Sequence, residues 1–439
     1  MVSQQTISGG RFYRWYVVGV LNLGLMAALT DRRVLNLLVE PIRRDLGVSD
    51  TAISLLLGLS FAIFFSTLGI PIGWLADRYS RRTILTASIA TWSLMTAACG
   101  LAATYAQLFL ARAGVGVGEA GYTPAAMAMI AAYFPGERRS TAISTYLMGA
   151  YTGTGLALII AATVIGLVSA RDTWLLPLIG LVRPWQLVLI IVGLPGLLIA
   201  LLMLAVREPP PEPAAAGAKG RASFGTVLRY VGEHRAAFSA ICGGRALFLT
   251  AIIGVNAWTP SFFIRTYGWS AQRAGLTLGA IIVVCSTLGI LAGGYLADAL
   301  TRRGSRDANV RVEIGAAVGM AFTCLIFPLM PTAWGAALWL VPAFFCRGAS
   351  TGVAMAAVQE MLPNAIRAQS TALYLAFVNI VSQGLGPTVV ALATDFVFHD
   401  PAALRYSLAV ITPLLLIAAL GCLIAGLRPF RAMKAAALA

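Results

Sequence analysis

The chain has 439 residues, of which 59% are hydrophobic and 11% are charged. Soluble domains carry roughly a quarter of their residues as charges, so this composition excludes an ordinary soluble protein and predicts one embedded in a lipid bilayer. The net charge of +15 is spread over many short segments rather than gathered in one domain, so we expect no nucleic-acid partner.

Apolar runs separated by charged or Pro/Gly-rich breaks predict twelve membrane-spanning helices, because about 20 apolar residues suffice to cross a bilayer. In the first half of the chain the runs are centred near Leu25, Phe64, Ser93, Met127, Leu156 and Ile191. In the second half they are centred near Ile253, Val284, Met320, Gly348, Ile380 and Leu415. The expected fold class is therefore all-α, a polytopic membrane protein with two six-helix bundles.

A segment of different composition joins the two predicted bundles. We expect residues 1–206 to form the N-terminal bundle, 207–235 a linker and 236–439 the C-terminal bundle. The linker contains Glu-Pro-Pro-Pro-Glu-Pro and an Ala/Gly-rich stretch, which cannot remain in lipid, so we place it in the cytoplasm. Its last part, Phe224 to His234, predicts a short surface helix.

The distribution of Arg and Lys predicts the orientation in the membrane. If the N-terminus is cytoplasmic, most basic residues fall in the inner segments. The outer loops then hold only Arg43, Arg44, Arg171, Arg183, Arg265, Arg273 and Arg405. By the positive-inside rule, both termini are expected in the cytoplasm. The placement of the cysteines and the loop lengths suggest a bacterial inner membrane.

An internal repeat relates the two halves. The segment Gly73 to Arg82 reads GWLADRYSRR and follows the second helix, and Gly294 to Arg303 reads GYLADALTRR and follows the eighth. Two homologous halves predict a pseudo-two-fold axis along the membrane normal, with the transport pathway between them.

These repeated loops resemble the signature of the major facilitator superfamily, and the resemblance extends over the whole chain. Within that superfamily the chain is similar to spinster-like transporters, through Asp31-Arg32 in the first helix and the segment Arg112 to Tyr122 in the fourth. The resemblance implies export of lysolipids or sphingolipids, in some members coupled to protons. Organic-anion:cation symporters have a similar Asp-Arg and a similar Arg…Glu, so a sugar acid or carboxylate is the alternative substrate.

Charged side chains inside apolar helices mark the candidate site, because each costs at least ~2.5–3.5 kcal/mol at the centre of a bilayer. Arg112 and Glu119 are seven residues apart and share one helix face. The resemblance places Asp31 and Arg32 opposite them. We expect a nearly neutral cluster in which Asp31 and Glu119 handle a proton and the arginines pair with them or with the substrate. Alternatively, these ions only fix the two helices together.

Both of these acids lie in the first half, whereas the second half offers Arg245 and Arg347. Arg347 aligns with Arg112 but has no acid seven residues later. Either arginine is expected to bind a phosphate or carboxylate of the substrate or to form a charge pair, or else it lies near a helix end and reaches lipid headgroups. Neutral polar contacts, to substrate or between helices, are expected from Asn256, Asn379 and Gln383. An apolar cavity wall, suited to an amphiphile, is expected from Phe248, Trp258, Phe262, Tyr374 and Phe377.

The repeated loops also predict a mechanical latch. Their charged residues lie at the cytoplasmic ends of helices, where they can hold the two halves closed on the inside. The latch candidates are Gly73, Asp77, Arg78, Arg81, Arg82, Asp298 and Arg302.

The function expected is secondary active transport by alternating access, with a lysolipid or another small molecule, protons and the lipid bilayer as partners of a monomer. The six cysteines and two histidines have no metal-binding spacing, so we expect no metal, no cofactor and no catalytic residue, and hence no enzyme. A non-transporting membrane receptor or scaffold is the alternative from another class, although it has no need of buried Asp31 and Glu119.

Overall fold

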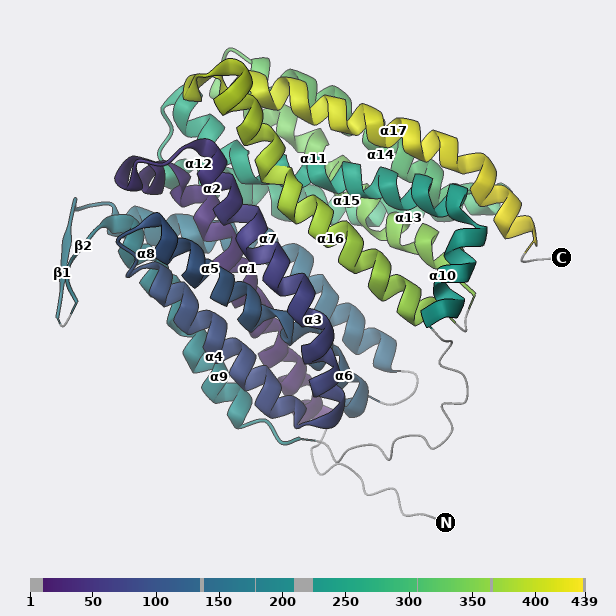
Figure 1. The fold of residues 1–439 in the computed structure, drawn as a ribbon, viewed down its shortest axis with the longest axis horizontal. Helices are drawn as coiled ribbons and strands as arrows, with labels where there is room; N and C mark the ends of the chain where they lie inside the picture. The colour runs from purple at the N-terminus through teal and green to yellow at the C-terminus, as the bar shows by residue number, and fades with distance from the viewer. Residues whose placement is uncertain are drawn as a thin grey trace. The chain divides into compact units, whose positions relative to one another are not determined.

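The computed structural model describes residues 11–134, 138–177, 179–208, 224–305, 307–363 and 366–436, and it is built almost entirely of helices (Figure 1). Each of the twelve apolar runs is centred within a helix. In the described residues, nine helical segments are long and apolar enough to cross a membrane. The runs around Ser93, Met127 and Leu156 are also helical. The prediction of a polytopic helical membrane protein is confirmed.

By their internal contacts, the helices fall into two compact units. The first unit comprises Met1–Gly47 and Ser60–Ala216, and the second comprises Val48–Leu59 and Gly217–Ala439. The second unit thus includes a short segment from the first half of the sequence. Residues 209–223 of the predicted linker lie outside the described residues, and the expected surface helix is present as α10 (Phe224–Glu233).

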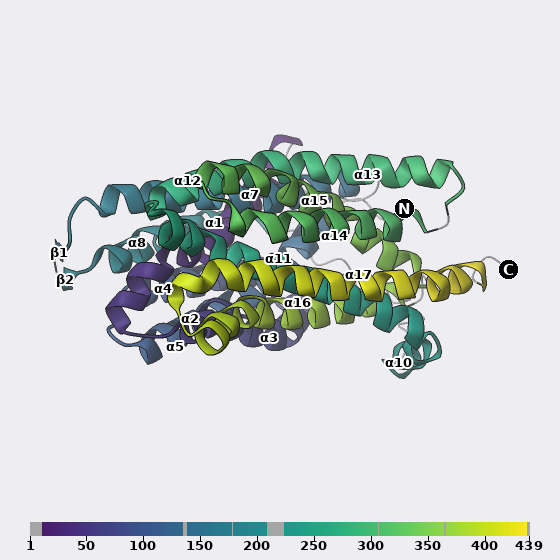
Figure 2. The same ribbon diagram turned by 90° about the horizontal axis from the view of Figure 1, so that it is seen from above.

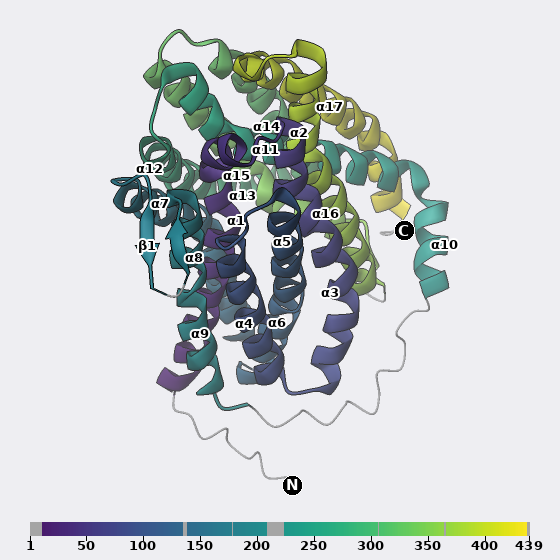
Figure 3. The ribbon, with the colours of Figure 1, turned by 60° about the vertical axis from the view of Figure 1, so that its left-hand side comes forward.

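The first unit contains the helices α1 (Arg11–Leu46), α3 (Ser60–Arg78), α4 (Arg81–Cys99), α5 (Tyr105–Ala120), α6 (Tyr122–Tyr133), α7 (Arg139–Val168), α8 (Pro184–Gly193) and α9 (Pro195–Leu204). Helix α1 packs against α7, and α5 packs against α3 and α4 (Figure 3). Two glycines permit the close approach of α5. A Cβ atom on Gly116 would lie 2.8 Å from the Phe61 carbonyl oxygen, and one on Gly118 would lie 2.5 Å from the Trp92 backbone nitrogen.

Two short strands depart from the all-α prediction. Strands β1 (Trp174–Leu176) and β2 (Gly180–Val182) form an antiparallel pair between α7 and α8, with Trp174 opposite Val182. The strand residues WLL and GLV are apolar, as are the helices before and after them. The composition of the sequence therefore does not distinguish these strands from helix ends. The Arg171 guanidinium lies 4.9 Å from the centre of the Trp174 ring and covers it.

The second unit contains α2 (Asp50–Ser54), α10, α11 (Arg235–Tyr267), α12 (Ala271–Ile281), α13 (Thr287–Arg302), α14 (Ala308–Ile326), α15 (Ala333–Glu360), α16 (Arg367–Leu392) and α17 (Leu404–Ala436). Helix α11 packs against α16 and α17, and α14 packs against α15 and α17 (Figure 2). Trp258 is fully buried, and its indole N–H donates to the Pro387 carbonyl oxygen at 2.8 Å, which satisfies the one polar atom of that side chain.

Polar contacts hold the segment Val48–Leu59 within the second unit. The Arg265 guanidinium donates to both carboxylate oxygens of Asp50, at 2.6 and 2.7 Å. The backbone N–H and the hydroxyl of Thr51 donate to Asp395, each at 2.7 Å. Charge-assisted, two-point contacts of this kind are strong and geometrically specific, so they explain why this segment groups with helices of the second half.

Candidate functional site

The four charged residues predicted as a cluster lie together inside the first unit. Helix α1 supplies Asp31 and Arg32, and α5 supplies Arg112 and Glu119. The Arg32 Nε donates to Glu119 Oε2 at 2.6 Å, and the two side chains form an ion pair. The Arg112 Nη1 donates to the backbone carbonyl of Asp31 at 3.3 Å. Two acids and two arginines therefore face one another, and their formal charges cancel.

Burial makes this cluster chemically unusual. Asp31, Arg112 and Glu119 are each 2% exposed. One carboxylate oxygen of each acid, Asp31 Oδ1 and Glu119 Oε1, has no hydrogen-bond partner among the described residues. A buried carboxylate with an unsatisfied oxygen is costly to keep charged. These two acids are therefore suited to exchanging a proton or a partner.

The environment of Asp31 includes a residue that the sequence did not indicate. The Thr96 hydroxyl on α4 donates to Asp31 Oδ2 at 3.1 Å. A threonine in an apolar helix is common and gives no signal of its own. Asp31 is thus held by a neutral hydroxyl from α4 rather than by Arg32, its neighbour in the chain.

Aromatic rings support both arginines. The Arg32 guanidinium lies 4.3 Å from the centre of the Phe61 ring and 4.8 Å from that of Phe65. The Arg112 guanidinium lies 5.3 Å from the same Phe61 ring. Cation–π contacts hold a guanidinium while leaving its N–H groups available. The spacing of Phe61 and Phe65 by four residues is the sequence signal that was overlooked.

Arg32 is the accessible member of the ion pair. Its side chain is 26% exposed, whereas that of Glu119 is 1% exposed. An anion approaching from the exposed side meets Arg32 first, and its negative charge competes with Glu119 for the same guanidinium. The geometry supports an exchange of partners in which the acid is released as the anion binds.

The second unit holds a buried ion pair that contains Arg245. Arg245 on α11 is 7% exposed, and its Nη1 donates to Glu313 of α14 at 3.2 Å and to the Ser350 hydroxyl of α15 at 2.5 Å. Arg245 therefore forms a charge pair in the interior of α11 rather than lying near a helix end, and its role toward a substrate stays a prediction. Buried acids are also not confined to the first half of the chain. Glu313 was overlooked because Arg311, two residues away, suggested a solvated helix end.

The remaining predicted polar residues of the second half take separate positions. Arg347 on α15 donates to the Ser286 hydroxyl at 3.4 Å. Asn379 donates to the Leu375 carbonyl within its own helix, α16, at 2.8 Å. Asn256 on α11 and Gln383 on α16 are half-buried. These contacts of Arg347 and Asn379 are with protein groups, and the role of both residues toward a substrate stays a prediction.

Most of the predicted apolar wall is interior packing, which corrects that expectation. Phe248, Trp258 and Phe262 are fully buried in the second unit. Tyr374 is 8% exposed and Phe377 is 50% exposed, and both line a cavity. Large aromatic residues in helices serve packing as readily as binding, and the sequence does not distinguish the two.

The latch residues are described only in part. The side chains of Gly73, Asp77 and Arg78 lie outside the described residues. The Arg81 backbone N–H donates to Glu208 at 2.5 Å, its guanidinium donates to the Ala128 carbonyl at 3.3 Å, and Arg82 is half-buried. Asp298 and Arg302 are exposed. The latch therefore stays a prediction.

A different acid organises the charged end of the second unit. Asp307, which precedes α14 and is 1% exposed, accepts hydrogen bonds from Arg431 of α17 at 2.8 and 2.5 Å and from Ser305 at 2.9 Å. Arg311 forms an ion pair with it at 3.0 Å. Asp307 does not differ from other loop charges in the sequence, because its partner Arg431 is 124 positions away in the chain.

Comparison with known proteins identifies the family. A model of the Major Facilitator Superfamily matches residues 21–391. An MFS-type efflux pump of Mycolicibacterium smegmatis is 29% identical over 403 residues, covering 89% of this chain and 86% of that protein. A probable galactarate/D-glucarate transporter of Bacillus subtilis is 24% identical, covering 84% and 83%. The sphingosine-1-phosphate transporter SPNS2 of Danio rerio is 26% identical, covering 70% and 62%.

A solved structure supports the same assignment. A bacterial homolog of the human lysosomal transporter Spinster, in an inward-facing and unoccupied conformation, superposes with a TM-score of 0.79 and 26% identity, covering 97% of this chain and 98% of that one. The resemblance to spinster-like transporters is thereby confirmed. With a family match that spans most of its length, the chain belongs to the Major Facilitator Superfamily and is a membrane transporter rather than an enzyme.

Proposed function

We propose that the protein is a proton-coupled transporter of an anionic amphiphile, such as a lysophospholipid or a sphingoid phosphate, and that it works by alternating access. The observation that carries this proposal is the Arg32–Glu119 ion pair, in which a partly exposed guanidinium neutralises a fully buried carboxylate next to buried Asp31. Ionisable groups inside membrane helices commonly mark substrate and proton pathways.

The exchange of partners gives the coupling its chemistry. Without substrate, Arg32 balances the charge of Glu119. When an anionic headgroup binds Arg32, Glu119 is left buried without its counter-ion, and it becomes neutral by taking up a proton. Asp31, with Thr96 and the Arg112 guanidinium nearby, is the neighbouring proton acceptor. Substrate binding at Arg32 is therefore coupled to proton uptake by Glu119.

Similarity to two kinds of transporter bears on the substrate. The name of the Danio rerio relative specifies sphingosine-1-phosphate, which combines an apolar chain with an anionic head. The name of the Bacillus subtilis relative specifies sugar acids, so proton-coupled transport of a small organic anion is the second candidate. Both candidates use the same arginine, and they differ in whether an apolar chain is needed.

Proton movement in liposomes tests the proposal. Purified protein is reconstituted with an internal pH dye, and a lysophospholipid, a sphingoid phosphate and a hexuronate are added in turn. We expect a pH change with the amphiphiles that is lost in Asp31→Asn and Glu119→Gln. Glu360→Gln, which removes a partly exposed acid of the second unit, is the matched control and should behave as the unmodified protein.

The outcomes separate the candidates. A pH change with the hexuronate alone replaces the amphiphile by a small organic anion. No pH change with any compound overturns proton coupling and leaves uncoupled transport or coupling to another ion. A full response in Glu119→Gln overturns the role of the ion pair.

The orientation is part of the proposal. We place both termini in the cytoplasm, because this arrangement leaves few basic residues in the outer loops. We also propose that the protein is a monomer in a bacterial inner membrane. Labelling of single cysteines introduced at Arg171 and Arg229 in intact cells tests the orientation. An impermeant reagent should modify position 171 and not position 229, and the reverse result would invert the topology.

A further inference from the structure

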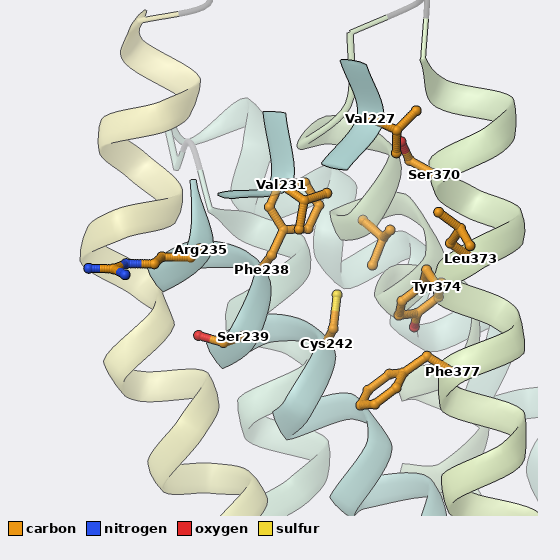
Figure 4. A pocket seen from close by; sticks show the side chains of 11 residues that line it. Val227, Val231, Arg235, Phe238, Ser239, Cys242, Ser370, Leu373, Tyr374 and Phe377 are labelled. Carbon is orange, nitrogen blue, oxygen red and sulfur yellow. The ribbon is translucent and has the colours of Figure 1, made fainter. Parts of the chain in front are cut away.

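A cavity of about 390 Å³ lies within the second unit, where α10, α11 and α16 meet. This volume is in the range of sites that bind small ligands. Figure 4 shows Cys242 and Phe238 of α11 facing Tyr374 and Phe377 of α16 across the space, while Arg235 is directed away from it. The side chains around the space are therefore mainly apolar.

The Arg245–Glu313 pair is not part of the cavity lining, but it lies close to two residues that are, Cys242 and Tyr374. Phe238, Cys242 and Arg245 follow one another on α11 at spacings of four and three residues, so they form one stripe on the helix. The Tyr374 side chain, which lines the cavity, interacts electrostatically with both Arg245 and Glu313. The cavity thus has an apolar lining, and a buried guanidinium lies about one helical turn beyond Cys242 on α11.

Glu313 shows what kind of group this guanidinium accepts. It is 1% exposed, and only its Oε1 bonds to Arg245, whereas Oε2 has no hydrogen-bond partner among the described residues. A single contact at 3.2 Å is weaker than the two parallel contacts that an arginine makes with a well-placed carboxylate or phosphate. An anionic ligand that offers two oxygens can therefore compete with Glu313.

We propose that this cavity is a second substrate-binding site, in which the chain of a single-chain anionic lipid lies against Phe238, Leu373 and Phe377 and its headgroup displaces Glu313 from Arg245. This inference rests on the proposed function, because it locates the apolar part of the same substrate class. It assigns Arg245 to headgroup binding and makes Glu313 the internal competitor that holds Arg245 until the ligand arrives.

Cys242 gives a direct measurement of occupancy, because it is a free thiol that lines the cavity. The full-length protein in nanodiscs is treated with a maleimide, and labelling of each cysteine is followed by peptide mass spectrometry. Cys285, a half-buried free thiol of the same unit outside this cavity lining, is the internal control. Three probes are compared: an oleoyl glycerol phosphate, the neutral monooleoylglycerol and glycerol phosphate without a chain.

We expect the anionic lipid to slow labelling of Cys242 about tenfold without affecting Cys285. The neutral lipid should protect only at higher concentration, and glycerol phosphate should not protect. Equal protection by the anionic and neutral lipids, or protection by neither, overturns the proposal.

Variants of the ion pair distinguish binding from structural support. Arg245→Gln should abolish the preference for the anionic lipid, whereas Glu313→Gln should increase the affinity for it, because the internal competitor is gone. A purely structural pair would weaken binding in both variants, and that result overturns the proposal. Tyr374→Phe keeps the ion pair and should lower affinity for the anionic lipid alone, which provides the test if the other variants do not fold. Arg273→Gln, on α12, is the control for loss of a positive charge.

The failure of this inference differs from failure of the proposed function. If the liposome pH change is intact and Cys242 is never protected, the second site is wrong and proton-coupled transport stands. If Cys242 is protected by the anionic lipid without any pH change, the site stands and proton coupling is wrong.

Discussion

Arg32 on α1 and Glu119 on α5 form an ion pair between two helices, and the two side chains differ in their access to solvent. The Glu119 side chain is 1% exposed and that of Arg32 is 26% exposed. The buried acid forms its ion pair with Arg32, whereas this arginine also lies over the Phe61 and Phe65 rings. The two residues therefore contribute unequally to stability, and this inequality can be measured.

Arg32→Gln should lower the free energy of unfolding by about 3–5 kcal/mol at neutral pH, because it leaves a buried carboxylate without a counter-ion. Glu119→Gln should cost only about 1–2 kcal/mol, since Arg32 retains aromatic contacts and solvent. Thermal unfolding of each variant in nanodiscs gives the comparison. The double variant should resemble Glu119→Gln, and equal losses in the two single variants would contradict the asymmetry.

Gly118→Ala should destabilise the first unit by about 1–3 kcal/mol and reduce transport, because the added Cβ would lie 2.5 Å from the Trp92 backbone nitrogen, next to Glu119 in the chain. Gly315→Ala is the matched control, since nothing lies within 4 Å of the added atom on α14. This control should be neutral or more stable by about 0.5–1 kcal/mol. Thermal unfolding and liposome flux are the measurements, and a Gly118→Ala protein with unchanged values would show that α5 moves away without cost.

The environment of Asp307, which precedes the membrane-spanning segment Ala308–Leu329, predicts that the folded protein loses stability in acid. Burial acts to raise the pKa of Asp307, but hydrogen bonds from Arg431, Ser305 and Arg311, together with the charge of Arg311, outweigh it and lower this pKa. A carboxyl group with a lowered pKa in the folded state stabilises the protein above the ordinary aspartate pKa. That stabilisation disappears as the pH falls through the folded-state value.

Hydrogen exchange of the α17 end between about pH 1 and pH 5 measures this effect. The unmodified protein should lose protection there as the pH falls, whereas Asp307→Asn should show weak protection throughout. Asp298→Asn, which alters an exposed aspartate of α13, should keep the behaviour of the unmodified protein. Parallel pH profiles for the unmodified protein and Asp307→Asn would contradict the prediction.

Asp50→Asn should destabilise the second unit by about 2–4 kcal/mol, because Arg265, whose side chain is 7% exposed, loses a partner that it contacts with two N–H groups. Exchanging the two charges, in Asp50→Arg with Arg265→Asp, should recover part of the loss. Thermal unfolding of the single and double variants tests this, with Asp172→Asn as an exposed control. A double variant that is less stable than either single variant would show that the stabilisation by this contact depends on its geometry rather than on opposite charges alone.

Helix positions were predictable from the sequence because apolar runs of sufficient length leave few alternatives in a bilayer. The cluster of Asp31, Arg32, Arg112 and Glu119 was also accessible, since charged residues are rare in such runs. Glu313 was not recognised, because an acid two residues from Arg311 is typical of the solvated end of a helix. Its partner Arg245 is 68 residues away, a distance at which sequence spacing says nothing about contact.

The two short strands and the grouping of Val48–Leu59 were also out of reach. Strands of three residues within an apolar stretch have no periodicity of their own. The contacts of Asp50 and Thr51 join residues more than two hundred positions apart, so they depend on tertiary structure alone.

The membership of Val48–Leu59 in the second unit has a consequence for expressing the halves of this transporter as separate polypeptides. A first-half fragment would carry Asp50 and Thr51 away from Arg265 and Asp395, and the second-half fragment would present that arginine and that aspartate without their counterparts. Co-expressed fragments should therefore reassociate through this short segment, whereas either fragment alone should be prone to degradation. The duplicated sequence suggests two interchangeable copies, but the second copy is completed by a segment of the first, so the two are not interchangeable.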